Sequence, residues 1–254
     1  MYGHDAGKPV LLRNCRPSAR RGLVSESTPV SSLSDRTRDE MLALFRQYFV
    51  DPDPARFHCD LEAKDVAILL RDSATSELRG FSTLAVDSTC VDGNPAGVLY
   101  SGDTVVAAAA RGTTELPRAW IRTVHEVAAD LPRPLYWLLI SSGFRTYRFL
   151  PLFFREFYPR HDAPAPPSVQ RLMDRLAESR FGAAYNARAG VVQFARGATP
   201  LRPELARVPP GRLKDPNVAF FLARNPGHAH GDELVCLTRV EPSNFTPAAR
   251  RMLG

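Results

Sequence analysis

GVLYSGDTVVAAAARGTTELPRAWIRTVHEVAADLPRPLYWLLI, residues 97–140, decides the fold of this chain. The stretch opens with a β-rich run (97–108), turns at 110–114, continues as a helix (115–129) and closes with a buried-strand run (135–140). A strand–helix–strand unit of this size predicts two neighbouring parallel strands joined by a right-handed crossover.

The turn in this unit is the best candidate for a cofactor site. Its residues are small apart from Arg111, and it lies where the helix begins. A helix start presented by such a turn offers unpaired backbone N–H groups to an anion, usually a phosphate. The alternative is an ordinary strand-to-helix connection.

The sequence before this unit predicts a helix and two strands. Apolar residues recur with helical spacing in SLSDRTRDEMLALFRQYF, where Thr37 and Glu40 have the spacing of a capping box, and DPDP ends the helix. VAILLRD (66–72) and LRGFSTLAVDST (78–89) are strand-like, and DGNP (92–95) is a turn. Together with the run at 97–108, these strands predict an antiparallel meander.

The sequence after this unit mixes helices and short strands. A helix is expected at 144–157, with a kink or a break at Pro151. The linker DAPAPP precedes a helix at 168–179, and strands follow at 189–194, 217–224 and 233–240, with a short helix in the tail. We expect an irregular segment, 1–30, and a single domain, 31–254, with a Pro-rich insertion near 160–168 and an extended C-terminal part.

Composition places the chain among ordinary globular proteins. It has 254 residues, of which 44% are hydrophobic and 24% charged. No apolar run reaches the roughly 18–20 residues of a membrane span, and no apolar region suggests a secretory signal. The four cysteines are scattered, which favours reduced, mostly buried thiols in a cytoplasmic protein.

The net charge of +6 comes mainly from arginine, which suits phosphates and carboxylates. An anionic ligand, an acidic partner protein and nucleic acid all fit this charge, and so does a genome rich in arginine codons. Charge alone therefore selects no partner. No recognisable nucleic-acid-binding module is present, and we expect no nucleic acid.

The order of elements over roughly residues 33–240 resembles the GNAT acyltransferase superfamily. The shared order is a helix, antiparallel strands, a long strand, a basic turn into a helix, a parallel strand, a helix and terminal strands. The resemblance implies an α/β (α+β) fold: a GNAT-like mixed, mostly antiparallel central sheet with a strand–turn–helix–parallel strand acyl-thioester site and helices on both faces.

In that family the long strand bulges, and the turn after it carries Q/R-x-x-G-x-G/A. RGTTEL (111–116) matches at its start, but Thr114 and Leu116 stand at the later glycine positions. Threonine does not freely allow close approach or positive φ. A single phosphate, as on the phosphopantetheine of an acyl carrier protein, needs fewer amides than the pyrophosphate of acyl-CoA. The resemblance implies thioester contacts from Val105, Val106, Arg111, Gly112, Thr113, Thr114, Ser141, Ser142 and Arg145.

Acyl transfer to an amine needs a base for the amine, donors for the oxyanion and an acid for the thiolate. The family often takes its base from the long strand, where Asp103 is the candidate. It often takes its acid from a tyrosine on the helix after the parallel strand, where Tyr147 is the candidate. Tyr158 and Tyr100 compete with Tyr147. No metal site is expected, since the histidines of the loop at 228–233 have no further histidine nearby.

Seven aromatic rings crowd residues 144–158, more than a single apolar stripe needs. The segment is either buried against the C-terminal part, or it lines a tunnel for a long acyl chain, with arginines outside for an acidic carrier protein. Similarity to GNAT-like enzymes of natural-product pathways implies a fatty acyl donor and an amine acceptor, such as a lysine or ornithine side chain of a peptide. We expect an N-acyltransferase, monomeric or homodimeric; the alternative is a catalytically silent binding protein with the same fold.

Overall fold

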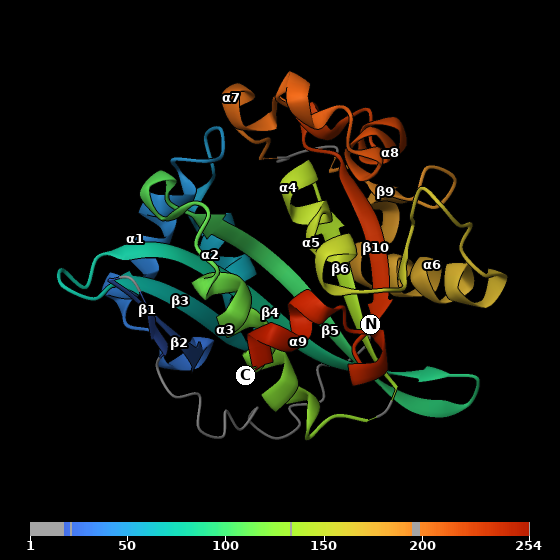
Figure 1. Cartoon of the computed structure of the whole chain (residues 1–254), viewed down its shortest axis with the longest axis horizontal. Helices are drawn as coiled ribbons and strands as arrows, with labels where there is room; N and C mark the ends of the chain where they lie inside the picture. Colours follow the sequence, from blue (N-terminus) through green and yellow to red (C-terminus); the bar gives the residue numbers. More distant parts are fainter. Residues whose placement is uncertain (1–17, 21, 133, 195–198, 254) are drawn as a thin grey trace.

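The computed structural model describes residues 18–20, 22–132, 134–194 and 199–253. Within these residues one mixed sheet has the order β1-β2-β3-β4-β5-β6-β10-β9-β8, and β7 pairs with β10 (Figure 1). β5 and β6 are parallel, whereas the other described pairs are antiparallel. The strands are β1 (Ser18–Arg20), β2 (Leu23–Pro29), β3 (Val66–Asp72), β4 (Leu78–Val91), β5 (Asn94–Val106), β6 (Leu135–Ser141), β7 (Phe157–Tyr158), β8 (Tyr185–Asn186), β9 (Val191–Val192) and β10 (Glu233–Arg239).

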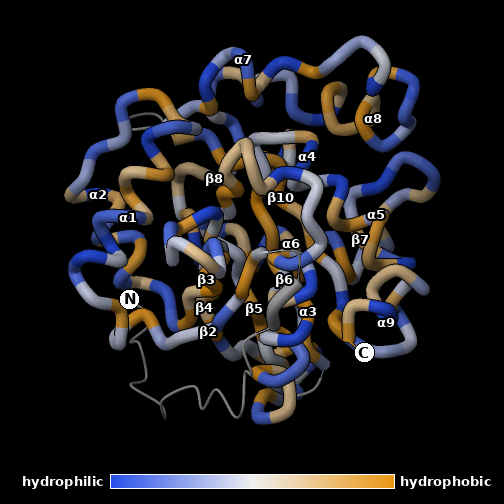
Figure 2. The backbone as a smooth tube through the Cα atoms, turned by 60° about the vertical axis from the view of Figure 1, so that its left-hand side comes forward, coloured by the Kyte–Doolittle hydropathy of each residue, from blue (hydrophilic) through white to orange (hydrophobic). Residues whose placement is uncertain are grey.

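Helices cover both faces of this sheet (Figure 1). One face carries α3, α5, α8 and α9 around a large apolar cluster, and the opposite face carries α1, α2 and α6. The most hydrophobic stretches lie in the central strands between these layers (Figure 2). The helices are α1 (Asp35–Phe45), α2 (Pro54–Glu62), α3 (Glu115–Ala128), α4 (Phe144–Tyr147), α5 (Phe149–Phe153), α6 (Pro167–Phe181), α7 (Pro203–Ala206), α8 (Pro216–Arg224) and α9 (Pro247–Leu253).

The predicted fold class is confirmed. β5 and β6 are parallel and adjacent, and α3 makes the crossover between them. Side chains alternate along β5, so that Leu99 packs into the core beneath α3 while Val98 and Tyr100 pack on the α6 side. The unit from β5 to β6 therefore connects the two layers of the molecule.

β5 contains a bulge where it separates from β6. Ser82 pairs with Thr104 but Leu84 pairs with Ser101, so Gly102 and Asp103 together oppose one residue of β4. Pairing with β6 ends at Ser101, although both strands continue. We call the opening between residues 102–106 and residues 140–141 the splay.

Glycine is required at the bulge by close packing. A Cβ on Gly102 would lie 2.5 Å from both the Lys64 Cε and the Thr83 Oγ1. Any larger residue would displace one of these buried side chains or the strand itself.

Several local predictions are wrong. The segment 217–224 is helix α8, not a strand, because Asp215 caps it and Pro216 occupies its first turn. The DPDP sequence (51–54) does not end the first helix, which already ends at Phe45. It begins α2 instead, with Asp53 as the cap, and His58 and Cys59 therefore lie on a helix. The first helix is capped by Ser34 rather than Thr37.

Three further predictions need correction. Residues 1–30 are not irregular throughout, because Leu23–Pro29 forms β2 and pairs along its length with β3; residues 1–17 lie outside the described part of the chain. The helix predicted at 144–157 is two short helices followed by β7. The cysteines are not mostly buried: Cys59 and Cys90 are exposed and Cys236 is buried, while Cys15 is not among the described residues.

Across the described ranges, the helices all fall short of the length and apolar character that crossing a membrane requires.

Candidate active site

A groove of about 1900 Å³ runs along the α2 and α6 face of the sheet and also takes in residues at the end of α3. Its floor is the surface of β4, β5 and β6 that α2 and α6 leave uncovered, and it includes Val98, Leu138 and Ile140. One end lies at the splay, beside Phe49 and Thr199, and the other reaches Pro132 near the β4–β5 hairpin. The groove is therefore far larger than one small amine.

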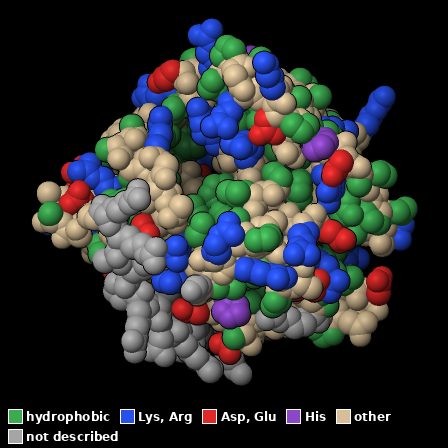
Figure 3. Space-filling model, in the orientation of Figure 1, with side chains coloured by type: hydrophobic (Ala, Val, Ile, Leu, Met, Phe, Trp, Pro, Cys, Tyr) green, Lys and Arg blue, Asp and Glu red, His purple; other side chains and the backbone are tan. Residues whose placement is uncertain are grey.

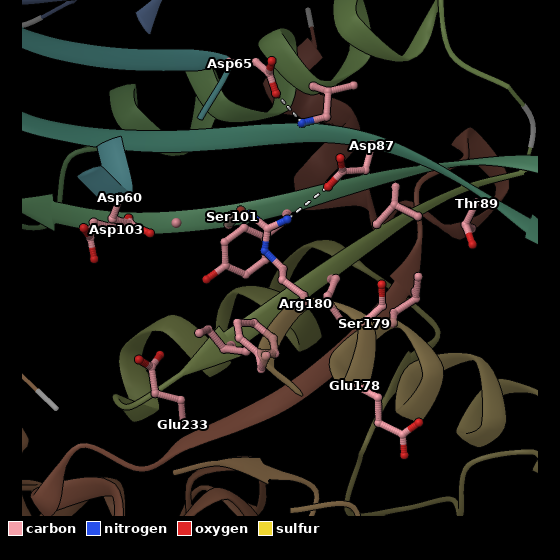
Figure 4. A pocket seen from close by; sticks show the side chains of 18 of the residues that line it. Asp60, Asp65, Asp87, Thr89, Ser101, Asp103, Glu178, Ser179, Arg180 and Glu233 are labelled. Atoms are coloured by element: carbon pink, nitrogen blue, oxygen red, sulfur yellow. Dashed lines mark hydrogen bonds and ion pairs between the residues drawn. The ribbon is translucent and has the colours of Figure 1, made fainter. Parts of the chain in front are cut away.

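Three carboxylates from three elements meet at the splay end of the groove. Asp60 comes from α2, Asp103 from the bulge of β5 and Glu233 from the start of β10 (Figure 4). Within the described residues, Asp103 and Glu233 form no side-chain hydrogen bond or ion pair. The bulge positions Asp103, because the extra residue redirects the strand at that point.

Burial and like charge raise the pKa values of Asp103 and Glu233. Burial, with Asp60 second, raises the pKa of Asp103 from its ordinary 3.8 to about 7. Burial, followed by the charges of Asp103 and Asp60, raises the pKa of Glu233 from 4.5 to about 8. A carboxylate with a pKa near 7 can accept a proton at neutral pH, which an ordinary carboxylate does poorly.

A buried cation lies beneath the bulge. Lys64 is 4% exposed, and its Nζ lies 2.7 Å from Asp60 Oδ2. The same Nζ donates to the Asp60 carbonyl at 2.9 Å and lies 5.5 Å from the centre of the Tyr100 ring. Lys64 lowers the pKa of Asp103, but burial and the charge of Asp60 raise it by more. The pKa of Asp103 therefore stays above its ordinary value.

Farther along the groove, Arg180 lies against Tyr100. Its guanidinium carbon is 3.7 Å from the ring centre, and its Nη1 forms an ion pair with Asp87 at 3.0 Å (Figure 4). Tyr100 is buried, which raises the pKa of its hydroxyl well above the ordinary value. Tyr100 therefore stays neutral and forms part of the groove floor.

The predicted phosphate turn lies at the other side of the splay, at the start of α3. Gly112 has φ +85°, so this position requires the glycine that the motif supplies. Thr113 Oγ1 accepts from the Glu115 N–H at 3.1 Å, and Pro117 has no N–H. The start of α3 therefore offers few amides to a diphosphate, and the turn fits a phosphate held mainly by side chains.

Arginines supply those side chains. Arg111 Nη2 donates to the Tyr48 hydroxyl at 3.2 Å, and that hydroxyl donates to the Val106 carbonyl. The pKa of Arg145 is lowered, first by burial and then by the charges of Arg111 and Arg212. Basic side chains surround a hollow on this face of the molecule (Figure 3). Cations gathered in this way favour an anion between them.

Residues 199–206, which we call the strap, cross the open end of the splay. The Pro200 carbonyl accepts from the Val50 N–H, and the Arg202 N–H donates to the Tyr48 carbonyl. Arg145 donates to the Leu205 carbonyl at 2.9 Å. The strap thus joins the end of α1 to the start of α4 above the splay.

The structure separates the predicted acid from the base. Tyr147 is fully buried beneath α8, where its hydroxyl donates to the Pro159 carbonyl at 2.9 Å, and burial raises its pKa. It is not among the residues that line the groove. Ser141 is also buried, and its hydroxyl donates to the Gly143 carbonyl at 2.8 Å. Ser142 is half-buried, and its neighbour Gly143 lies near Leu201 of the strap.

The other predicted thioester contacts are divided between the faces of β5. Val105 is buried towards α1 and α2, and Val106 lies half-buried towards α3. Thr114 is the cap residue of α3 but makes no capping hydrogen bond with its side chain. Arg111, Gly112, Thr113 and Arg145 lie together around the splay, whereas Asp103 faces the groove.

The aromatic segment fills the core. Tyr147 packs against Phe221 at 5.6 Å between ring centres, and Phe154 packs against Phe245 at the same distance. The alternative in which this segment is buried against the C-terminal part is therefore the one observed. Sequence reasoning missed Asp60, Glu233 and Tyr48, because no local motif marks them.

Comparisons with known proteins add the following. No protein-family model and no curated protein matches the chain. Among solved structures, a probable N-acyltransferase from Enterococcus faecalis is similar over 53% of this chain and 33% of its own (12% identity, TM-score 0.38). An N-myristoyltransferase of Saccharomyces cerevisiae with bound myristoyl-CoA is similar over 54% and 35% (13% identity, TM-score 0.39). A GCN5-related N-acetyltransferase of Kribbella flavida is similar over 54% and 34% (14% identity, TM-score 0.39). The matched region spans about a third of the length of each of these proteins.

Proposed function

We propose that the protein is an N-acyltransferase, which moves an acyl group from an acyl thioester to an amine. The observation that carries this proposal is Asp103. Its carboxylate lies in the β5 bulge at the splay, and its raised pKa of about 7 suits a base. The acceptor side is the acidic groove, and the donor side is the basic face of the splay.

The residues support a sequence of proton movements. An ammonium acceptor enters the groove and is held by the carboxylates of Asp60, Asp103 and Glu233. Asp103 takes its proton, and the neutral amine attacks the thioester carbonyl, whose oxyanion accepts from backbone N–H groups of the splayed strand. As the C–S bond breaks, the proton on Asp103 passes to the thiolate and the nitrogen gives up its second proton to water in the groove, giving a neutral amide, a free thiol and one proton released to solvent. The site then needs no separate acid.

The donor would be acyl-CoA or the acyl-phosphopantetheine of an acidic carrier protein. Arg111, Arg145 and Arg212 would hold its phosphate, and the main chain of Val105 and Val106 would contact its arm. These donors occur in the cytoplasm, where we place the protein. A fatty acyl group rather than acetyl, and a peptide lysine or ornithine as acceptor, are the finer parts of the proposal. Because the aromatic segment fills the core, it does not set the length of the acyl chain. The donor panel described next determines the preferred length.

The test is a panel of donors against a panel of amines. Acetyl, octanoyl and palmitoyl thioesters, on CoA and on a carrier protein, are incubated with amines, and both thiol release and the mass of the amide are followed. The proposal expects thiol release that depends on the amine and is lost in Asp103→Asn. Absence of both thioester binding and turnover across the panel would contradict it.

The second candidate is a catalytically silent binding protein. Its support is the start of α3, where Thr113 and Pro117 leave few amides for a donor phosphate. A silent protein would bind a thioester with the same affinity in the wild type and in Asp103→Asn, and neither would release thiol.

A further inference from the structure

We propose that the acyl donor is an acidic acyl carrier protein, which docks on a basic and apolar surface beside the splay. We call this surface the docking face, and it consists of Leu152, Arg207, Arg212, Leu213 and Lys214. The inference rests on the proposed function, which supplies the thioester, and it adds the partner that carries the thioester and the surface that this partner contacts. It follows from the charge of the docking face, its connection to the splay and its exposed leucines.

The first property is positive charge that is available to a partner. Residues 199–214 contain four cationic side chains and one carboxylate, Glu204. Three of these cations, Arg207, Arg212 and Lys214, are exposed, and within the described residues they form no ion pair. An anionic partner can therefore pair with them without displacing a carboxylate of this chain.

The second property is that this charge continues into the splay. Arg111 donates to the Tyr48 hydroxyl and Arg145 to the Leu205 carbonyl, and both acceptors are neutral. Among the described residues neither guanidinium pairs with a carboxylate, so both keep a full positive charge. Burial, followed by the charges of Arg111 and Arg212, lowers the pKa of Arg145, which indicates that the three cations repel one another. Arg212 thus connects the docking face to the donor side of the splay.

The third property is exposed apolar surface next to these cations. Among the described residues, Leu152 and Leu213 are the large hydrophobic side chains that are about half exposed, at 52% and 50%. Single exposed leucines are ordinary, but one ion pair links these two, from Arg148 Nε to Asp215 Oδ2 at 3.0 Å. Leu213 is two residues before Asp215, and the Leu152 N–H donates to the Arg148 carbonyl at 3.3 Å. Apolar side chains with charges around them are typical of protein–protein interfaces.

These properties fit a carrier protein better than CoA. CoA carries a diphosphate, whereas Thr113 and Pro117 leave few amides at the start of α3 to bind one. The phosphopantetheine arm of a carrier protein has a single phosphate, which guanidinium groups can hold with their side chains. Carboxylates of the protein that bears the arm would pair with the outer cations, and its apolar residues would cover the leucines. Nucleic acid and anionic membranes are also attracted by cations, but neither delivers a thioester to the splay.

The experiment measures binding without transfer. Three acidic carrier proteins, one each from fatty-acid, polyketide and non-ribosomal peptide synthesis, carry a fluorophore and an octanoyl arm with an amide in place of the thioester. Fluorescence anisotropy with the full chain gives dissociation constants at low and at high salt, and the octanoyl amide of CoA is measured by competition. At least one carrier protein should bind about tenfold more tightly than the CoA compound, an advantage that high salt reduces.

Variants assign this advantage to the docking face. Lys214→Glu should weaken carrier binding about three- to tenfold and Leu213→Ala about threefold, while both change binding of the CoA compound by less than twofold. Arg171→Glu is the matched control for the charge reversal, because Arg171 is an exposed arginine of α6, on the opposite face of the sheet. Melting curves verify that each variant is folded.

Three results would each overturn the proposal. The first is carrier proteins that all bind no more tightly than the CoA compound. The second is equal effects of Lys214→Glu and Arg171→Glu on carrier binding. The third is a DNA duplex, or vesicles containing phosphatidylglycerol, that bind as tightly as the best carrier protein and are weakened equally by Leu213→Ala.

Failure of this inference is distinguishable from failure of the proposed function. Transfer from acyl-CoA to amines, with no preference for carrier proteins, overturns the docking face and retains the transferase. Carrier binding that depends on Leu213 and Lys214, without transfer from any thioester, retains the docking face and overturns the transferase.

Discussion

Replacing Asp103 by asparagine should stabilise the protein while it removes activity. The folded protein binds the Asp103 proton more tightly than the unfolded chain, because the pKa rises from 3.8 to about 7. The cost of ionising this carboxylate is therefore absent below about pH 4, grows as the pH rises towards 7 and is constant above it. Asparagine is neutral at every pH and avoids the cost.

The gain in stability expected for Asp103→Asn follows from the pKa shift of Asp103. A change of about three pKa units corresponds to about 4 kcal/mol, and water in the groove reduces this to about 2 kcal/mol. For a chain of this size, that free energy raises the melting temperature by roughly 4–8 °C. We expect this increase at pH 8.5 and less than half of it at pH 5, where part of the cost has disappeared.

Calorimetry of the wild type, Asp103→Asn and the control Glu62→Gln at both pH values measures the stability. Turnover at pH 7 should fall by about 10²- to 10⁴-fold in Asp103→Asn, which is the usual contribution of a base. An unchanged melting temperature at pH 8.5 would refute the electrostatic argument. A loss of turnover smaller than threefold would refute the catalytic role.

Three other variants test separate parts of the structure. Gly102→Ala should lower the free energy of unfolding by about 1–3 kcal/mol in urea titrations, because its Cβ would lie 2.5 Å from Lys64 Cε; an unchanged midpoint would contradict the packing. Tyr147→Phe should cost about 1 kcal/mol of stability through the lost hydrogen bond to Pro159 and change kcat by less than threefold; a large loss of kcat at unchanged stability would make Tyr147 the acid after all. Arg111→Gln should raise the KM for the thioester about fivefold at constant kcat, and a fall in kcat alone would contradict its assignment to the donor phosphate.

The central strands and the crossover could be predicted because their signals are local. VAILLRD, LRGFSTLAVDST and LYWLLI are strand-length apolar runs between turn residues. The segment 217–224 was predicted wrongly because VAFFLA is apolar all round, and periodicity does not separate a buried helix from a buried strand. The Asp215-Pro216 cap was the available signal, and so was Asp53-Pro54 for α2.

The site was predictable only in part, for a physical reason. Asp103 could be proposed from the sequence because it lies on the strand that precedes the turn. Its raised pKa depends on burial and on Asp60, which comes from a helix that the sequence did not reveal. Glu233 joins the group only because β10 pairs with β6. Such long-range proximity is a property of the tertiary fold and has no local sequence pattern.

The strap has an evolutionary consequence. Pro200, Arg202 and Leu205 are held in part through their main-chain atoms, and main-chain hydrogen bonds tolerate most replacements of the side chain. Leu201, which reaches Gly143 above the splay, can therefore be exchanged without releasing the strap. In related chains, selection could alter the shape of the splay by single substitutions here while the sheet and its acidic groove stay unchanged. With the proposed assignment of the splay to the donor, donor preference would then diverge faster than acceptor preference.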